Sequence, residues 1–322
     1  MAAFCIGIDL GGTFIKAALL DEQLTVRNQQ QLPTPIDAGP EAVIKAMARA
    51  ARAALLEGGV SLADVVGVGI GSPGLLDLPA GVVIGMPNIP GFENVPIRDR
   101  LAEMLALPAV LENDANAAAL AEYLVGVGRG AKLMILLTLG TGIGGGIVAD
   151  GKLLHGAHGL AGEIGHIIVA PGGRACGCGQ QGCLERYASA TYLAQHARLL
   201  IEQQGRQSSL AQLLRDKGEF DARDVQVAAG AGDSLAKEVW DEAIRYLAIA
   251  AVSLTDVLDP DLIVLGGGMA NAGEALLDPL TEHFHREQRK LNAVTPRLAM
   301  AQLGNDAGVI GAAGAAWQEF GK

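Results

Sequence analysis

The chain has 322 residues, of which 50% are hydrophobic and 18% are charged, and its formal net charge is −11. This composition excludes an intrinsically disordered protein, and at about 150 residues per domain the length indicates two domains. The acidic balance excludes a duplex-DNA binder, which needs a basic face. We expect a cytoplasmic location and no membrane partner, because the first residues do not have the pattern of a signal peptide and no apolar run reaches the roughly 18 residues of a membrane span.

The first third of the chain predicts a β-hairpin followed by alternating helices and strands. Strands over residues 4–8 and 14–20 flank the glycine turn Asp9-Leu-Gly-Gly-Thr13. A helix is expected over 40–57 and a buried strand over 65–70, which ends at Gly71-Ser-Pro-Gly74. The stretch 79–96 is rich in proline, glycine and asparagine and is expected to be a loop. It precedes a helix, a strand and a helix at 97–105, 109–111 and 115–124.

The rest of the chain begins with a second strand–glycine turn–strand unit. Its strands are expected at 132–139 and 147–149, around Gly140-Thr-Gly-Ile-Gly-Gly-Gly146, and this repetition indicates two related halves. Residues 156–185 form a loop rich in glycine and cysteine. Helices are expected at 188–203, 210–215, 225–229, 234–258 and 307–320, and strands at 262–265 and, on an edge, 297–302. The alternation favours an α/β fold, with a domain border near residues 115–130.

Three glycine-rich turns at strand ends could hold the phosphates of a nucleotide. They are the turn at Asp9–Thr13, the turn at Gly140–Gly146, and Gly266-Gly-Gly-Met269. Glycine lets backbone N–H groups approach phosphate oxygens, Thr13 adds a hydroxyl, and Asp9 is a suitable ligand for Mg²⁺. A tight hairpin alone would explain any one turn, but three of them favour nucleotide binding. Neither a Walker A motif nor a strand-to-helix Rossmann turn is present.

Residues 112–116, Glu-Asn-Asp-Ala-Asn, lie between an expected strand and an expected helix. A carboxylate at such a helix start ordinarily caps the helix, and this is the simple explanation of Asp114. Beside phosphate-binding turns, Asp114 could instead accept the proton of a substrate hydroxyl that attacks a γ-phosphate. Asn113 could then hold neighbouring hydroxyls through its amide.

A cysteine and histidine cluster predicts a metal site. His166, Cys176, Cys178 and Cys183 have the spacing His-x9-Cys-x-Cys-x4-Cys and supply the four soft ligands of a closed, structural zinc site. Free thiols or a redox pair are the alternative, although a disulfide across Cys-x-Cys would be strained. Glu163 and Glu185 flank this loop and suit hydrogen bonding to sugar hydroxyls. The alternative interpretation is that Glu163 and Glu185 are ordinary solvated glutamates on the surface.

These motifs together resemble the ROK family (repressor, open reading frame, kinase) of sugar kinases, within the actin-like ATPase and hexokinase superfamily. The resemblance covers essentially the whole chain, and its most specific carrier is the segment Cys176–Glu185. It implies two α/β domains of the actin-like ATPase (ribonuclease H-like) type with an interdomain cleft. Residues 1–117 would form the N-terminal domain, to which the helix at 305–322 returns, and residues 118–304 the C-terminal domain with the zinc loop.

The resemblance implies ATP-dependent phosphorylation of a hexose at its 6-hydroxyl, with Asp114 as general base, Mg²⁺ as cofactor and a role in glycolysis. It places Gly74, Asn88, Asn113, Glu163, His166 and Glu185 on the sugar. It places Asp9, Gly11, Gly12, Thr13, Lys16, Gly140, Thr141, Gly142, Gly266, Gly267 and Gly268 on ATP and Mg²⁺. It further implies a homodimer or homotetramer whose other partners are small molecules.

Two departures from the family's patterns bear on the sugar. His158 stands where the glucokinase group commonly has asparagine, and Leu75-Leu76-Asp77 lacks the arginine associated with N-acetylmannosamine kinases. The second feature favours glucose. N-acetylmannosamine, N-acetylglucosamine, mannose, fructose and allose stay open as substrates, as does polyphosphate as the donor. A sugar sensor without catalysis is the alternative of a different class, and the intact Asp114 argues against it.

Overall fold

The computed structural model describes residues 3–86, 89–290 and 295–321. Contacts divide the chain into two compact units. Unit 1 comprises Met1–Gly130, Gly146–Ala161 and Gln302–Lys322, and unit 2 comprises Ala131–Gly145 and Gly162–Ala301. Unit 1 includes the whole of helix α3 (Asp114–Leu124), which packs against the C-terminal helix α10 (Ala307–Phe320). The expected border after residue 117 falls within α3 and stays a prediction.

The sheet of unit 1 brings three strand ends to one edge. Its strand order is β3-β2-β1-β4-β8, with β1 (Phe4–Leu10), β2 (Phe14–Asp21), β3 (Val26–Pro33), β4 (Val65–Ser72) and β8 (Ala109–Asn113). The predicted hairpin is confirmed, since β1 and β2 pair in antiparallel fashion. β4 runs parallel to both β1 and β8. The register places Asp9 beside Gly71 and Asn113 beside Ser72, so the glycine turn and the Asn113-Asp114 turn occur at the same end of the sheet.

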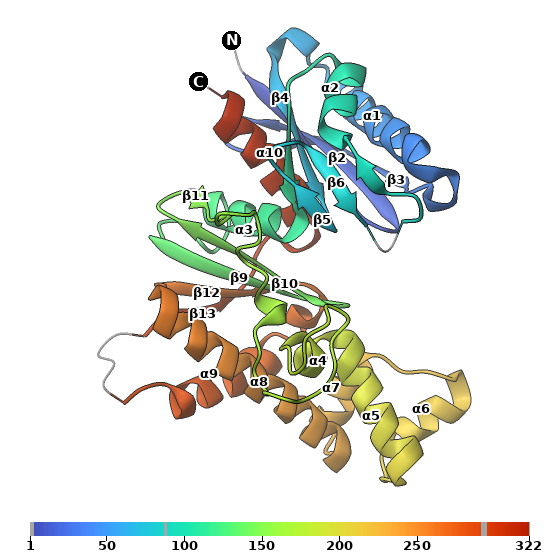
Figure 1. Cartoon of the computed structure of the whole chain (residues 1–322), viewed down its shortest axis with the longest axis vertical. Helices are drawn as coiled ribbons and strands as arrows, with labels where there is room; N and C mark the ends of the chain where they lie inside the picture. The colour runs from blue at the N-terminus through green and yellow to red at the C-terminus, as the bar shows by residue number, and fades with distance from the viewer. Residues whose placement is uncertain (1–2, 87–88, 291–294, 322) are drawn as a thin grey trace. The chain divides into compact units, whose positions relative to one another are not determined.

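Alternation along the strands creates a core on each face of this sheet (Figure 1). Ile6 and Ile8 of β1 pack with helix α1 (Gly39–Glu57), whereas Cys5, on the opposite face, packs with α10. Successive strand residues point to opposite faces, so one short strand contributes to both cores. Helix α2 (Ile97–Leu105) adds Ile97 and Leu101 to the core on the α1 side.

Glycines allow α10 to lie directly on the strands. A Cβ atom at Gly69 would come within 1.6 Å of the Ala312 carbonyl oxygen, and one at Gly7 within 2.0 Å of the Val309 carbonyl oxygen. Both obstacles are backbone atoms of α10, which cannot move aside as a side chain could. The small side chains of α10 continue this close packing, since its residues 311–316 are all buried Gly or Ala.

Gly69→Ala is therefore expected to lower the free energy of unfolding by about 3 kcal/mol or more, the upper range for overpacking. Urea denaturation followed by circular dichroism would measure the loss. Gly230→Ala is the matched control, because a Cβ atom at Gly230, the last residue of α7 (Ala222–Gly230), meets nothing within 4 Å. Equal stability of the two variants would contradict this account of the α10 contact.

The second five-stranded sheet repeats the topology of the first. Its order is β11-β10-β9-β12-β13, formed by β9 (Leu133–Leu139), β10 (Ile143–Ala149), β11 (Lys152–Leu153), β12 (Leu262–Gly266) and β13 (Arg297–Met300). β12 runs parallel to β9 and β13, as β4 does to β1 and β8. The predicted repetition of the hairpin is thus confirmed at the level of strand order, and β13 lies at the edge as expected. The helices of unit 2 are α4 (Glu185–Ala188), α5 (Ala190–Gln204), α6 (Leu210–Lys217), α7, α8 (Ser234–Leu258) and α9 (Glu274–Glu287).

The prediction of a loop over residues 79–96 was wrong in part. β6 (Val82–Gly85) and β7 (Glu93–Val95) join β5 (Leu75–Asp77) in a three-stranded sheet. These strands have three or four residues, too few for an alternating pattern to stand out from turn-forming neighbours. β3 and α9 were also not anticipated. β3 is polar along most of its length, and α9 contains Pro279, which local rules treat as a helix breaker.

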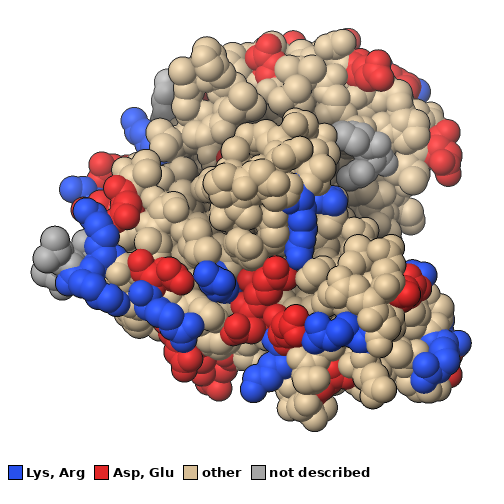
Figure 2. Space-filling view, turned by 60° about the horizontal axis from the view of Figure 1, so that its bottom comes forward, with Lys and Arg blue, Asp and Glu red and all other residues tan. Residues whose placement is uncertain are grey.

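Two surface properties follow from the composition. On the face drawn in Figure 2, Lys and Arg side chains lie intermixed with Asp and Glu side chains. Ion pairs between such residues include Arg206 with Glu238 and Arg198 with Glu202. Within the described ranges, no helix combines the length and apolar character needed to cross a bilayer.

Candidate functional site

Asp9, near the end of β1, is partly buried and lies close to both a positive and a negative charge. Lys16 stands opposite it in the β1–β2 register, and its Nζ donates to the Asn305 carbonyl oxygen at 2.5 Å. Burial and the nearby charge of Asp114 raise the pKa of Asp9 to about 6, while Lys16 opposes this rise. A Cβ atom at Gly308 would come within 2.8 Å of the Asp9 carboxylate, so this carboxylate packs against the first turn of α10. A divalent cation would relieve the repulsion that Asp9 experiences.

The first glycine turn is closed by hydrogen bonds that require glycine at position 11. The Gly11 N–H donates to the Phe14 carbonyl oxygen at 3.0 Å, and a Cβ atom at Gly11 would come within 2.8 Å of the same oxygen. The Thr34 hydroxyl and N–H hold the turn from β3's end, through the carbonyl oxygens of Gly11 and Thr13. Gly12 and Thr13 are exposed, as groups that contact phosphate must be.

Asn113, rather than Asp114, is the N-cap of α3. The Asn113 Oδ1 accepts from the N–H groups of Ala115 (2.9 Å) and Asn116 (3.2 Å), which is the geometry of a capping side chain. Asp114 is the first helical residue, and its Oδ1 accepts from the Ala115 N–H at 2.8 Å. The simple explanation of Asp114 as the helix cap is therefore wrong. Asp114 remains available for chemistry at the helix N-terminus.

The environment of Asp114 favours a proton acceptor of moderate strength. Burial raises the pKa of this carboxyl above its ordinary value, against hydrogen bonds from the Ala115 N–H and the Asn113 side chain. A carboxylate with a raised pKa holds a transferred proton better than an exposed aspartate does. The charge of Asp114 acts on Asp9, at the end of the sheet where β1 and β8 both end.

Gly74 borders a separate hollow of unit 1. This hollow, about 530 Å³, is lined by residues of the three-stranded sheet and of the segment 89–93. Gly74 has φ +98°, and a Cβ atom there would come within 2.5 Å of the Gly85 carbonyl oxygen, so only glycine fits. Asn88, also predicted to contact the sugar, lies outside the described residues.

In unit 2, the two remaining glycine turns line one hollow of about 660 Å³. Gly140 and Thr141 come from the β9–β10 turn, and Gly268 comes from the end of β12. A Cβ atom at Gly267, which has φ +82°, would come within 2.5 Å of the Leu139 carbonyl oxygen, so glycine there lets the turns approach each other. The structure thus brings together these predicted nucleotide-binding turns.

Sequence reasoning missed the helical wall of this hollow. It is contributed by Asp221, Ala222, Arg223 and Gln226 of α7 and its cap, and by Trp240 of α8. The Trp240 indole N–H donates to the Ala275 carbonyl oxygen, which fixes the ring. No local motif marks these residues, because an ordinary amphipathic helix has the same pattern.

Glu185 connects the β9–β10 turn, one of the predicted nucleotide-binding turns, with the segment that carries the cysteines. Its Oε2 accepts from the Ile143 N–H at 3.0 Å, directly after the Gly140–Gly142 turn. A Cβ atom at Gly142 would come within 2.3 Å of that oxygen, so the carboxylate lies against the turn itself. A ligand that moves Glu185 would therefore also move the β9–β10 turn.

The four predicted zinc ligands converge within unit 2. Their ligand atoms, His166 Nδ1 or Nε2 and the Sγ atoms of Cys176, Cys178 and Cys183, all lie within 4.8 Å of one another. The Cys178–Cys183 Sγ–Sγ distance is 3.7 Å, and the Cys176 Sγ–His166 Nδ1 distance is 3.8 Å. A tetrahedral site with Zn–S bonds of about 2.3 Å has ligand–ligand edges of about 3.8 Å, so the donor set fits zinc. All four cysteines of the chain are free thiols.

His166 has a different neighbour on each ring nitrogen. Nδ1 faces Cys176, whereas Nε2 lies 3.9 Å from the Glu163 Oε2. Both residues belong to the short 3₁₀ segment η3 (Ile164–His166) and its cap. A metal bound at Nδ1 would fix the ring orientation and leave the Nε2 edge, with Glu163, for a ligand.

The cysteine loop has a second anchor that the sequence did not reveal. The Arg174 guanidinium lies over the Tyr187 ring at 4.4 Å and donates to Glu242 of α8 and to the Arg186 carbonyl oxygen. The Tyr187 hydroxyl accepts from the Arg174 N–H. These contacts join the loop to α4, which begins at Glu185, and to α8.

Comparisons with known proteins agree with these features. The model of the ROK family matches residues 5–319. A glucokinase of Halalkalibacterium halodurans is 42% identical over 307 residues, which cover 95% of this chain and 92% of that protein. The crystal structure of a ROK hexokinase from Thermus thermophilus has a TM-score of 0.86 at 40% identity and covers 99% of both chains. That of a ROK family glucokinase from Streptomyces griseus, in complex with glucose and AMPPNP, has a TM-score of 0.80 at 36% identity and covers 98% and 100%.

The likeness extends over both repeated sheets and the cysteine loop. It confirms the predicted α/β fold of the actin-like ATPase type, which the matching strand orders already indicated. The expected resemblance is likewise confirmed over nearly the full length. The chain belongs to the ROK family.

Proposed function

We propose that this protein is an ATP-dependent hexose kinase that phosphorylates glucose at its 6-hydroxyl. The observation that carries the proposal is the position of Asp114, a partly buried carboxylate with a raised pKa at the start of α3, close to Asp9. The full-length similarity to glucokinases supports both the reaction and the sugar. The hollow beside the Gly140 and Gly268 turns supports nucleotide binding.

In this reaction the sugar O6 attacks the γ-phosphorus, the bond from that phosphorus to the bridging oxygen breaks, and ADP leaves. Asp114 accepts the proton that O6 loses. Asn113 keeps its cap through Oδ1. Its Nδ2 donates one hydrogen to Asp114 and has a second hydrogen for a neighbouring sugar hydroxyl. Phosphoryl transfer depends mainly on positioning and charge stabilisation, so a single base of moderate strength is sufficient.

Two metal ions have separate roles in the proposal. Asp9 would hold Mg²⁺, which would neutralise charge on the phosphates of ATP. His166, Cys176, Cys178 and Cys183 would hold a structural zinc ion, which would fix the segment that carries Glu163 and Glu185. His166, Glu163, Glu185, Asn113, Asn88 and Gly74 would contact the sugar. Asp9, Gly11, Gly12, Thr13, Lys16, Gly140, Thr141, Gly142, Gly266, Gly267 and Gly268 would contact ATP and Mg²⁺.

The cytoplasmic location stays a prediction from the sequence, and the place in glycolysis and the homodimer or homotetramer stay predictions from the resemblance. The division into domains at 1–117 with 305–322, and 118–304, likewise stays a prediction beside the contact-based units.

A sugar panel tests the proposal. Purified protein with ATP and Mg²⁺ is assayed for ADP release on glucose, N-acetylmannosamine, N-acetylglucosamine, mannose, fructose and allose, and kcat/KM is compared across them. We expect glucose to rank first. A higher kcat/KM for N-acetylmannosamine would replace glucose but keep the kinase, whereas sugar binding without ADP release on any hexose would favour a sensor. Polyphosphate in place of ATP tests the donor.

The raised pKa of Asp114 predicts an acid limb in the pH profile. Asp114 accepts a proton only as a carboxylate, so kcat/KM for glucose falls as the pH drops through its pKa, which lies above the ordinary value for aspartate. The same raised pKa means that the folded protein binds this proton more tightly than the unfolded chain. The contribution of Asp114 to stability therefore improves as the pH falls, and the lost activity is not unfolding at this group. An acid limb at or below the pKa of an exposed aspartate, about 3.9, would contradict the assignment.

A further inference from the structure

Glu112 is a buried carboxylate directly before the Asn113-Asp114 turn, and each of its two oxygens has a hydrogen-bond partner. It is 4% exposed, at the penultimate position of β8. Its Oε1 accepts from the Asn113 N–H and from the Asn116 Nδ2, both at 2.9 Å. Its Oε2 lies 2.7 Å from the His155 Nε2. None of the roles assigned to the predicted site residues uses Glu112 or His155.

These hydrogen bonds join Glu112 to residues on both sides of Asp114 in the chain. Asn113 precedes it and caps the helix, and Asn116 occupies the first turn of α3 two residues later. One carboxylate therefore holds the backbone on one side of Asp114 and a side chain on the other. A shift of Glu112 would displace the helix start, and with it the Asp114 carboxylate, relative to Asp9.

His155 supplies the hydrogen-bond partner of the second oxygen of this buried carboxylate. A buried carboxylate without a charged or hydrogen-bonded partner is costly, and removal of one partner leaves the other uncompensated. His155 follows β11, and its side chain is 40% exposed. Its carbonyl oxygen accepts from the Ala161 N–H at 3.1 Å, while the Leu154 N–H donates to Ile147, so the segment is held on both sides of the ring.

The ring of His155 borders a hollow of about 500 Å³ that includes Asp77, Glu112 and His158 in its lining. The Glu112 hydrogen bond and charge raise the pKa of His155, which favours the imidazolium form that pairs with this carboxylate. The pair thus joins the 154–161 segment to the base of the β8–α3 turn.

We propose that Glu112 and His155 are a positioning pair that holds Asp114 in its reactive place. The proposal deepens the proposed kinase function and rests on it. The pair acts through Asn113 and Asn116 rather than by contact with the substrate. Its loss should therefore slow the chemical step while substrate binding stays nearly unchanged.

His155→Ala and His155→Gln test the pair. His155→Ala removes the donor to Glu112, and we expect kcat to fall about 10- to 100-fold, as for a base displaced by about 1 Å. KM for glucose and for ATP should stay within about twofold, because ground-state contacts are kept. His155→Gln places an amide N–H near the position of Nε2, so it should recover most of the lost kcat.

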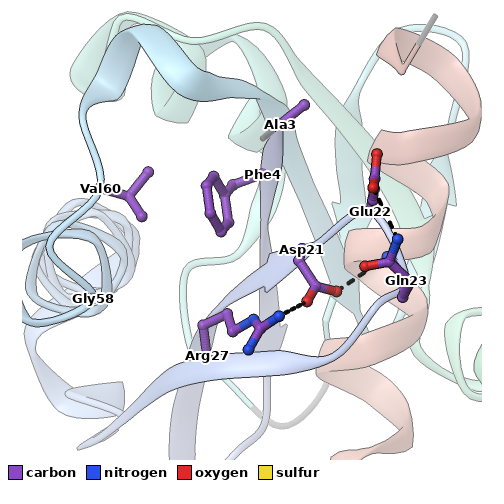
Figure 3. Close-up of a pocket in the computed structure, with 8 residues that line it drawn as sticks. All are labelled: Ala3, Phe4, Asp21, Glu22, Gln23, Arg27, Gly58 and Val60. Atoms are coloured by element: carbon purple, nitrogen blue, oxygen red, sulfur yellow. Dashed lines mark hydrogen bonds and ion pairs between the residues drawn. The ribbon is translucent and has the colours of Figure 1, made fainter. Parts of the chain in front are cut away.

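Asp21→Asn is the matched control. Asp21 is a buried carboxylate of the same unit whose Oδ1 accepts from the N–H groups of Gln23 and Thr25. Its Oδ2 forms an ion pair with Arg27 at 2.5 Å (Figure 3). In the strand register Asp21 lies opposite Phe4, which is at the other end of β1 from Asp9. The five residue steps along the strand from Phe4 to Asp9 span roughly 16 Å, so Asp21 is far from Asp9. Asp21→Asn should lower the melting temperature while kcat stays unchanged.

The outcomes separate a positioning pair from a purely structural one. If His155→Ala lowers the melting temperature as Asp21→Asn does but leaves kcat intact, the proposal is overturned. It is also overturned if KM rises while kcat is kept, or if His155→Gln behaves like His155→Ala.

If the unmodified protein phosphorylates no sugar, the proposed function fails, and the pair is then judged without turnover. The ¹³C resonance of the Asp114 carboxyl, assigned by comparison with Asp114→Asn, is titrated in the unmodified protein and in His155→Ala. Identical titrations would show that the pair does not set the surroundings of Asp114, and different ones would support it.

Discussion

Asp114→Asn is expected to reduce kcat for glucose by about 10³-fold, within the range for loss of a general base, while glucose still binds. Asparagine keeps the shape of aspartate and one acceptor oxygen for the Ala115 N–H, so the start of α3 is preserved. It cannot take up a proton from O6. Glucose binding by isothermal titration calorimetry and turnover by ADP release would measure the two effects separately.

The neighbouring cap supplies the control for this variant. Asn113→Asp keeps a capping oxygen for the N–H groups of Ala115 and Asn116 but replaces the amide donor proposed for a sugar hydroxyl. It also removes the hydrogen bond from Asn113 to Asp114, so it should raise KM for glucose and lower kcat, but lower kcat by less than Asp114→Asn does. Near-normal turnover by Asp114→Asn would remove the general base from the mechanism, whatever sugar the protein prefers.

Cys178→Ser is expected to remove about one equivalent of zinc per chain and to lower the melting temperature by roughly 5–10 °C. Cys178 is exposed, so the change creates no cavity in a core, and the loss of stability can be assigned to the loss of zinc. Loss of the metal frees His166 and the segment that carries Glu163, so KM for glucose should rise too. Elemental analysis and differential scanning calorimetry provide the readouts.

Cys5→Ala is the control among the cysteines. Cys5 lies in β1, in the core against α10 and in the other unit, and takes no part in the cluster. It should cost some stability by loss of packing while the zinc content stays at one equivalent. A Cys178→Ser protein that is fully active, fully stable and free of metal would contradict a structural zinc site.

Local sequence was enough to predict the turns and the cysteine cluster of the candidate site. The turn at Asp9–Thr13, the turn at Gly140–Gly146 and the cysteine spacing are short motifs whose geometry depends on neighbours within a few residues. Glycine at positions 11 and 267 is required by close backbone approach in the folded chain. The hairpins and the edge strand at 297–300 were predicted for the same reason, since alternation and turn residues are local signals.

Local rules failed where a short element depends on a distant partner. The strands β6 and β7 are stable because they pair with each other and with β5, and β3 because it pairs with β2. The role of helix cap went to Asn113 instead of Asp114, although both are good capping residues. Which of the two residues caps α3 depends on where β8 ends. The Glu112 side chain accepts from the Asn113 N–H and so fixes the end of the strand at Asn113.

By itself, then, the sequence determined the family, the α/β class, the glycine turns and the cluster of His166 with three cysteines, because each depends on residues close together in the chain. The general base and the bound zinc stay predictions. Only the tertiary structure decided that Glu112 meets His155 across 43 positions, that Glu185 touches the turn after Gly142, and that α10 lies on Gly7 and Gly69. Contacts of this kind arise from strand register and helix packing, which bring together side chains that no local pattern relates.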